Sequence, residues 1–266
     1  MKTDLVFDQT TLQLYSNYVG IQTIKELQSH LQFIQQQLKK IGTSYRCIEH
    51  YKFASSRMTQ RFFYSMLLKY GQQYDKPFLL DIGCCTGTDL RQLYLDGYPK
   101  DYLVGIDTSS HYIDCGYDLF RDRSQCPIIF MIGDIFNDEL LNEKQWMVVM
   151  AGSVIHLFQD MDQVERFVKR MTQLLQSGGL FVGAHVSMLH TGTVSRQVNG
   201  QTKNKFYIGQ DDFHVILTRY GFKEIQFETE QRIPEEEEEE EEDTCLLDSI
   251  HHLFWLSFSA IYSPLD

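Results

Sequence analysis

The chain has 266 residues, of which 43% are hydrophobic and 23% charged, so it has the composition of a globular protein with one sizeable core. Its net charge of -12 includes a run of eight glutamates, and the sequence carries no basic stripe, which argues against a nucleic-acid partner. The six cysteines form no CxxC pair, which argues against a zinc ribbon, and we predict no metal site.

Residues 1–75 are predicted to form a helical N-terminal cap or lid. The first residues, MKTDLVFDQT, lack the apolar region of a signal peptide. Apolar side chains then recur at helical spacing within IQTIKELQSHLQFIQQQLKKIG, and Gly42 is a plausible helix stop. The periodic positions are Ile24, Leu27, Leu31, Ile34 and Leu38.

Residues 76–266 are predicted to form one α/β domain. Short apolar runs alternate with helical segments, and the runs are FLLDIG, YLVGIDTS, PIIFMIGDI, WMVVMAGSV and LFVGAHVS. Continuous apolar runs are typical of parallel strands that are buried on both faces. The alternation therefore predicts a doubly wound, Rossmann-like parallel sheet.

The C-terminal part is predicted to be a polar loop (190–205), a helix (QDDFHVILTRYG) and two final strands, FKEIQFETE and HLFWLSFSAIYS. No helical pattern separates those strands, so they are expected to pair antiparallel, with an acidic insert (234–244) in their loop. We expect that insert to be solvated and mobile, and Trp255 and Phe258 to belong to the core. Because the last apolar stretch is too short to span a bilayer, we expect a cytoplasmic protein with reduced thiols and no membrane partner.

The stretch FLLDIGCCTGTDL predicts a nucleotide-binding turn between a strand and a helix. Asp81, Gly83 and Gly87 form the turn, Asp107 follows Gly87 by 20 residues, and Asp134 ends the third strand. An acid at the first position suits a cationic ligand better than a pyrophosphate. S-adenosylmethionine has an ammonium and a sulfonium and no phosphate, and the helix start near Thr86 can receive its carboxylate. The predicted cofactor-binding residues are Asp81, Gly83, Cys84, Cys85, Gly87, Asp107, Thr108, Asp134, Ile135, Gly152 and Ser153.

Two adjacent cysteines occupy the middle of this turn, and Cys85 stands where a glycine is usual. A cysteine is a small hydrophobe and can line the turn if its backbone angles are ordinary. The alternative is a redox thiol or nucleophile, which methyl transfer does not need. We favour packing, although a thiol near a helix start could have a lowered pKa.

The segments LLDIGCCTGTDLRQL, GYDLFRDR, GDIF, VVMAGSVIHLF and YRCIEHYKF together resemble the class I S-adenosylmethionine-dependent methyltransferases of fungal meroterpenoid pathways. The resemblance covers about residues 40–230. It implies a seven-stranded sheet of order 3-2-1-4-5-7-6 with strand 7 antiparallel, and an enzyme that converts the carboxylic acid of a small secondary-metabolite-like molecule into a methyl ester.

His156, just past the fourth strand in AGSVIHLF, is the candidate catalytic base. A carboxylate acceptor is already ionised at neutral pH and needs no base, whereas a phenol or alcohol does. His156 could equally cap or pack at the strand end. His185, at the end of the fifth strand, faces the acceptor or is a satisfied core histidine.

The segment with Tyr45, Arg46, Tyr51 and Arg57 could form a lid over donor and acceptor, and either arginine could pair with a substrate carboxylate. The alternative is a packing layer with surface arginines. Three further functions remain open at this point: a hydroxyl O-methyltransferase with His156 as base, a cofactor-binding protein without turnover, and methylation of a protein side chain.

Overall fold

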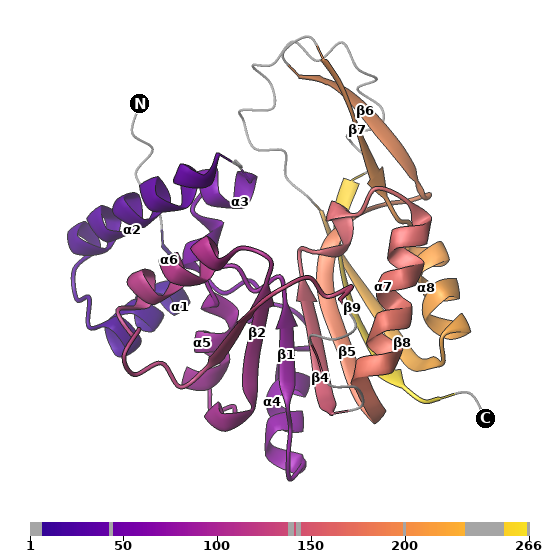
Figure 1. Cartoon of the computed structure of the whole chain (residues 1–266), viewed down its shortest axis with the longest axis horizontal. Coiled ribbons are helices and arrows are strands. Elements are labelled where there is room, and N and C mark those ends of the chain that lie inside the picture. The colour runs from indigo at the N-terminus through magenta and orange to yellow at the C-terminus, as the bar shows by residue number, and fades with distance from the viewer. Residues whose placement is uncertain are drawn as a thin grey trace. The chain divides into compact units, whose positions relative to one another are not determined.

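The computed structural model describes residues 7–42, 45–137, 141, 145–198, 201–231 and 253–264. The chain folds as two compact units, Met1–Leu140 and Leu141–Asp266 (Figure 1). The main sheet has the strand order β3-β2-β1-β4-β5-β9-β8. Its last two strands in the chain pair antiparallel, so the predicted order 3-2-1-4-5-7-6 with an antiparallel seventh strand is confirmed.

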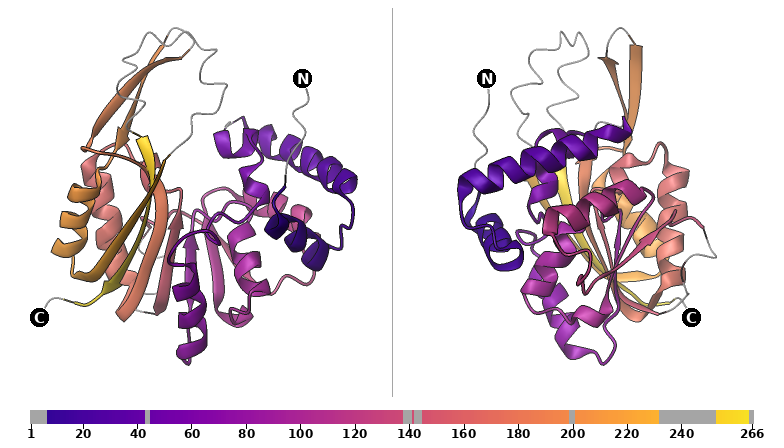
Figure 2. Two further views of the ribbon diagram at one scale, coloured as in Figure 1. Left: turned by 180° about the vertical axis from the view of Figure 1, so that it is seen from behind. Right: turned by 60° about the vertical axis from the view of Figure 1, so that its left-hand side comes forward.

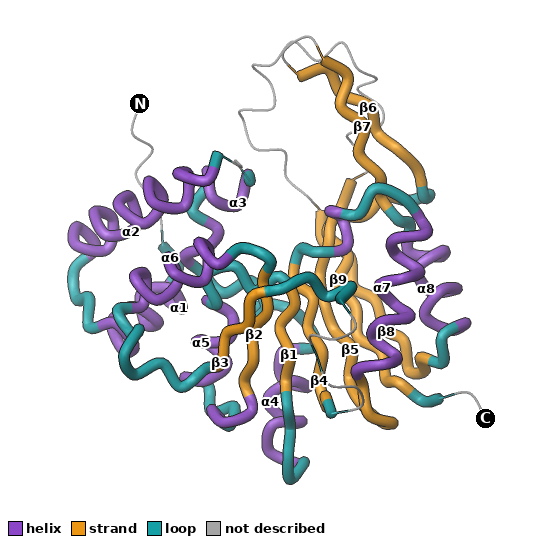
Figure 3. Tube along the Cα trace, in the orientation of Figure 1, coloured by secondary structure: helices purple, strands orange, loops and turns teal. Residues whose placement is uncertain are grey.

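The first unit begins with helices and continues into three parallel strands (Figure 3). Its helical elements are α1 (Gln9–Leu14), the π-helical turn η1 (Tyr15–Val19), α2 (Ile24–Leu38), η2 (Lys39–Ile41), α3 (Arg46–Glu49), η3 (Lys52–Ala54), α4 (Tyr64–Gln73), α5 (Thr88–Leu95), η4 (Lys100–Tyr102) and α6 (Ser110–Phe120). Its strands are β1 (Leu79–Ile82), β2 (Leu103–Asp107) and β3 (Ile129–Ile132).

Helix α2 follows the predicted apolar spacing. The Thr23 hydroxyl caps it by accepting from the Glu26 backbone N–H at 3.2 Å. Leu27, Leu31, Ile34 and Leu38 are buried, whereas Ile24 is exposed because it is the first helical residue. This helix and α6 share one hydrophobic cluster, so the N-terminal helices pack on the helix that follows β2. The division at residue 75 stays a prediction.

The second unit contains the elements β4 (Trp146–Gly152), η5 (Ile155–Leu157), α7 (Met161–Leu174), β5 (Leu175–Met188), β6 (Gly192–Val198), β7 (Gln201–Tyr207), α8 (Gln210–Arg219), β8 (Phe222–Gln231) and β9 (Leu253–Tyr262). The predicted hairpin of the last two strands is confirmed, since β8 pairs antiparallel with β9. The predicted acidic insert (234–244) lies outside the described residues. Phe258 is fully buried as predicted, but Trp255 is only partly buried.

The predicted polar loop at 190–205 is wrong. Strands β6 and β7 pair antiparallel from Gly192↔Tyr207 to Val198↔Gln201 and form a separate two-stranded ribbon. Figure 2 shows this ribbon extending beyond the end of β5. At its base, Val194 and Tyr207 are buried in a hydrophobic cluster with Val186 of β5 and Leu253 of β9.

Candidate functional site

The glycine turn after β1 is held against the end of β2. The backbone N–H groups of Gly83 and Cys84 both donate to the Ile106 carbonyl, at 2.8 and 3.1 Å. Gly83 and Gly87 have φ of +68°, which favours glycine. A Cβ on Gly87 would lie 2.5 Å from the Phe130 ring, so this position has no room for a side chain.

Asp107, at the end of β2, is bonded to the same turn. Its Oδ2 atom accepts from the Cys85 backbone N–H and its Oδ1 atom from the Ser109 N–H, both at 2.9 Å. Burial raises the pKa of Asp107, and these backbone donors oppose the shift. The structure thus brings Asp107 and the turn together. Thr108, the residue after Asp107, is exposed.

Asp81 is a buried acid whose pKa is raised well above its ordinary value. Burial is the largest cause, repulsion from Asp89 and Asp107 adds to it, and Arg57 opposes it. A carboxyl group in this position lacks sufficient positive charge nearby. The role of Asp81 as the partner of a cationic ligand stays a prediction.

Asp134 lies in the turn after β3. Its side chain is exposed, and its Oδ1 atom accepts from the Phe136 backbone N–H at 2.9 Å. The neighbouring Ile135 is buried. This arrangement orders the turn at the end of the third strand, where a cofactor-binding acid was predicted.

Cys85 of the turn departs from the expectation of ordinary backbone angles. Cys85 has φ of +51°, in the left-handed region, which explains why glycine is usual at this position. Burial raises the pKa of both Cys84 and Cys85, so the predicted lowering is wrong. Cys85 instead packs against the N-terminal hydrophobic cluster together with Cys47 and Tyr51.

The predicted lid segment is fastened to the start of α5. The Phe53 carbonyl accepts from the hydroxyls of Thr86 and Thr88, at 3.3 and 2.6 Å. Asp89 Oδ1 accepts from the Ser56 hydroxyl at 2.6 Å and from the backbone N–H of Arg57 at 3.0 Å. Sequence reasoning missed these contacts, although the polar run TGTD directly after the glycine turn was the available signal.

Two aromatic residues of this segment are placed differently. Tyr45 is exposed and lies edge-on to Tyr112 at 6.3 Å between ring centroids. Tyr51 is partly buried, has φ of +57° and packs beside Phe53. The side chain of Arg46 lies outside the described part of the structure.

In the second unit, His156 is held by the strand beside it. Gly152 of β4 pairs with Ala184 of β5, and Ser153, with φ of +62°, donates its N–H to the Ala184 carbonyl at 2.7 Å. His156 follows on η5. Its Nδ1 atom accepts from the Val186 backbone N–H at 3.3 Å, and its ring lies edge-on to Trp255 at 6.1 Å.

His185 lies in the core, which corrects the expectation that it faces an acceptor. It is fully buried, edge-on to the rings of Phe213 and Phe258 at 5.3 and 6.0 Å. Neither ring nitrogen has a hydrogen-bond partner within the described residues, so it is not a satisfied core histidine either. Burial lowers its pKa to about 3, which keeps the ring neutral.

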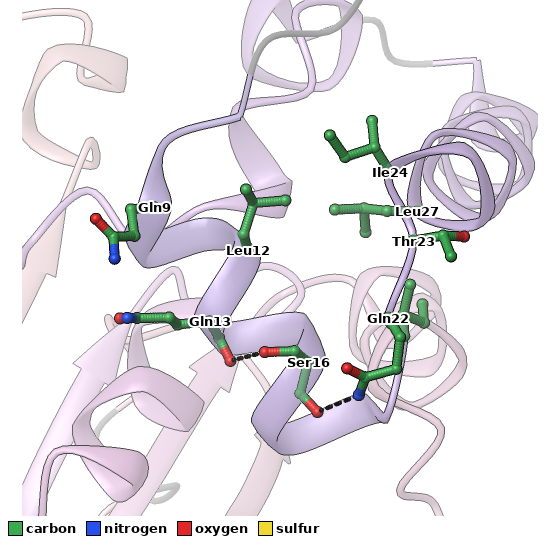
Figure 4. A pocket seen from close by; sticks show the side chains of 9 residues that line it. Gln9, Leu12, Gln13, Ser16, Gln22, Thr23, Ile24 and Leu27 are labelled. Carbon is green, nitrogen blue, oxygen red and sulfur yellow. Dashed lines mark hydrogen bonds between the residues drawn. The ribbon is translucent and has the colours of Figure 1, made fainter.

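A separate pocket of about 200 Å³ lies between α1 and the start of α2 (Figure 4). Leu12, Ile24 and Leu27 give it an apolar lining, and Gln22 donates to the Ser16 carbonyl at 3.3 Å beside it. None of the predicted site residues lines this pocket. Within the described residues no group of three or more His, Cys, Asp or Glu could hold a metal ion, and no helix there could cross a membrane.

A family model described as a methyltransferase domain matches residues 79–179. O-methyltransferase phiE of a fungal species is 39% identical over 130 residues, which are 47% of this chain and 43% of that protein. O-methyltransferase atr3 of Stereocaulon alpinum is 30% identical over 188 residues, 68% of this chain and 53% of that protein. Asnovolin E/Chermesin D methyltransferase nvfJ of Aspergillus novofumigatus is 34% identical over 149 residues, 54% of this chain and 52% of that protein. The chain thus spans about half the length of these relatives.

Solved structures share the fold at low sequence identity. Phosphoethanolamine N-methyltransferase 2 of Haemonchus contortus, in complex with S-adenosyl-L-methionine, has a TM-score of 0.54 at 16% identity, over 75% of this chain and 51% of that one. The [4+2]-cyclase SpnF has a TM-score of 0.55 at 16% identity, over 76% of this chain and 80% of that one. The chain therefore carries a methyltransferase domain of the Rossmann-like fold and is similar to fungal O-methyltransferases.

Proposed function

We propose that the chain is an S-adenosylmethionine-dependent O-methyltransferase that converts the carboxylate of an apolar organic acid into a methyl ester. The match of residues 79–179 to a methyltransferase domain and the fungal O-methyltransferase relatives support the reaction class. The hydrogen bond between His156 and Val186 is the observation that favours a carboxylate acceptor.

The first unit supplies the residues that would hold the donor. Asp81 fits the ammonium group because it is buried with a raised pKa, and Asp107 would accept from the ribose hydroxyls. The backbone N–H groups at the start of α5 would receive the donor carboxylate. When bound, S-adenosylmethionine supplies an electrophilic methyl group that an acceptor oxygen displaces from sulfur in line.

His156 in the second unit is suited to donate a hydrogen bond. A backbone N–H can only donate, so the Val186 N–H requires an unprotonated Nδ1 and places the proton of the neutral ring on Nε2. Such a ring can orient a carboxylate through Nε2–H. It is poorly suited to take a proton from a phenol or alcohol, because its lone pair is already engaged.

Apolar side chains near His156 indicate the character of the acceptor. Trp255 packs edge-on to the ring, and Val186 and Met188 belong to the hydrophobic cluster at the base of the β6–β7 ribbon. Leu157 and Leu189, which follow His156 and β5, are 50% and 62% exposed. An acceptor with an apolar body and one carboxylate matches these side chains.

The test is methylation of matched acceptor pairs. Purified chain is incubated with methyl-labelled S-adenosylmethionine and an apolar carboxylic acid, or with the phenol and the alcohol of the same skeleton. We expect label in the acid only, released as methanol by mild alkali because the product is an ester. Alkali-stable label in the phenol or alcohol would instead establish the hydroxyl O-methyltransferase. Donor binding without labelling of any acceptor, fungal metabolite extracts included, would favour a cofactor-binding protein without turnover.

A further inference from the structure

The guanidinium group of Arg91 binds the carbonyls of the donor turn. Arg91 lies on α5, and its Nη1 atom donates to the carbonyl oxygens of Thr86 and Gly87, at 2.8 and 3.3 Å. Its side chain is fully buried. These two peptide groups lead into the first turn of α5, so Arg91 sets their orientation.

Asp122, two residues after the end of α6, fixes the guanidinium in turn. Arg91 Nε lies 2.8 Å from Asp122 Oδ2, and Nη2 lies 2.9 Å from Oδ1, so the pair is bidentate. The Asp122 side chain is only 3% exposed. The Phe120 ring lies 4.3 Å from the guanidinium carbon and the Phe130 ring 5.1 Å from it. Desolvation makes a buried pair of this kind a poor source of stability, so its fixed geometry is its main effect.

Tyr18 connects this pair to the N-terminal helices. It lies on the π-helical turn η1, and its hydroxyl donates to Asp122 Oδ2 at 2.8 Å. Its ring packs edge-on against Phe120 at 5.6 Å. Burial would raise the pKa of Asp122, but the bonds from Arg91 and Tyr18 outweigh burial and lower it, so the carboxylate stays charged.

We infer that Tyr18, Asp122 and Arg91 form a positioning chain that holds the Thr86 and Gly87 peptide groups ready for the carboxylate end of the methyl donor. The inference rests on the proposed function in that it takes S-adenosylmethionine as the ligand of this turn. None of these three side chains would itself contact the donor. The N-terminal helices thereby support donor binding and do not act only as a cover.

The opposite side of the Thr86 carbonyl is also tightly packed. A Cβ on Gly116 of α6 would collide with the Thr86 carbonyl oxygen. Helix α6 therefore closes one side of this peptide group while Arg91 binds its oxygen. The turn has little freedom to adapt when Arg91 moves.

The test compares two ligands that differ only at the amino-acid end, which is the end that the positioning chain of Tyr18, Asp122 and Arg91 would orient. S-adenosylhomocysteine carries the amino-acid end, whereas methylthioadenosine has the same adenosine without it. Calorimetry gives the dissociation constant of each ligand for the unaltered chain, Tyr18→Phe and Arg91→Lys. Tyr64→Phe is the matched control, because the Tyr64 hydroxyl donates to Asp96 Oδ2 at 2.6 Å in the same unit, and this hydroxyl bonds neither turn carbonyl among the described residues.

We expect Tyr18→Phe to weaken S-adenosylhomocysteine about threefold and Arg91→Lys roughly tenfold, with methylthioadenosine unchanged and Tyr64→Phe without effect on either ligand. Equal weakening of both ligands would show a purely structural role and overturn the inference. Unchanged affinities of both ligands for Tyr18→Phe would also overturn the inference. This variant removes only one oxygen, so it tests the positioning chain even if Arg91→Lys does not fold. If the unaltered chain binds neither ligand, the proposed function fails together with the inference.

Discussion

The backbone N–H of Val186 donates to Nδ1 of His156 at 3.3 Å, and this contact determines which ring nitrogen carries the proton. The neutral ring must carry it on Nε2, because a backbone N–H cannot accept. The contact lies within β5 and the short helix η5, so it does not depend on a bound ligand. His156 therefore presents a hydrogen-bond donor.

This tautomer predicts a small effect of His156→Ala. With a carboxylic acid as acceptor, the variant should lose no more than about tenfold in rate, because one positioning hydrogen bond is removed. His156→Gln keeps an N–H donor and should retain more activity than His156→Ala. Initial rates of both variants and the unaltered chain on the same acid check this.

The pH profile gives an independent measurement of the same point. For a carboxylate acceptor the rate should be flat from about pH 6 upward, since carboxylic acids ionise near pH 4. A loss on the order of 10²–10⁴-fold in His156→Ala, with a rate that rises near pH 6.5, would instead identify His156 as a base acting on a hydroxyl.

Asp107→Asn should weaken both donor analogues. The ribose is common to S-adenosylhomocysteine and methylthioadenosine, and a lost hydrogen bond to a charged acceptor costs roughly 1.5–3 kcal/mol. Asparagine retains one oxygen for the Cys85 or Ser109 N–H, which limits damage to the turn. Asp114→Asn, an exposed acid paired with Arg123, is the control. Calorimetric affinities equal to those of the unaltered chain would remove Asp107 from the donor site.

Cys85→Gly should stabilise the fold. The left-handed backbone at Cys85 costs roughly 1–2 kcal/mol for a residue with a Cβ, and glycine does not pay this cost, although its greater freedom in the unfolded chain offsets part of the gain. Cys85→Ala is the matched control, because it removes the thiol and keeps the strained Cβ. Thermal unfolding should rank Cys85→Gly above Cys85→Ala. If both variants fold but lose methyl transfer equally, the thiol itself has a role.

The order of the sheet could be predicted because buried parallel strands leave continuous apolar runs separated by helices. The β6–β7 ribbon was missed, although Asn199-Gly200 between two polar runs is a hairpin signal. The ribbon has few apolar residues, so hydrophobic patterning did not reveal it.

The turn acids could be placed from spacing, but their contacts could not. Arg91 and Asp122 are 31 residues apart and meet only because α5 and the end of α6 lie together in the fold. The burial of His185 also could not be predicted, because in GAHVSM it shares one face of the strand with the polar Ser187, while the apolar side chains lie on the other face. Only the packing of Phe213 and Phe258 shows that it points into the core.

Asp81→Asn should stabilise the fold and weaken the donor at the same time. Burial, and then Asp89 and Asp107, raise the pKa of Asp81 above its ordinary 3.8, so the unfolded chain releases this proton at a lower pH than the folded chain. The stability that Asp81 contributes to the free energy of unfolding is therefore fully present below pH 3.8, and it is lost as the pH rises through the raised pKa of the folded chain. Asparagine does not titrate, so the variant should have a higher melting temperature than the unaltered chain at neutral pH, and the difference should shrink toward pH 3.8.

S-adenosylhomocysteine should bind to Asp81→Asn about tenfold more weakly, because a charged partner of its ammonium is lost, while methylthioadenosine, which has no ammonium, should bind as before. Asp101→Asn, at an exposed acid of the same unit, should change neither quantity. A variant that melts lower and binds both ligands less well would show that Asp81 supports the turn as a structural acid and does not receive the ammonium.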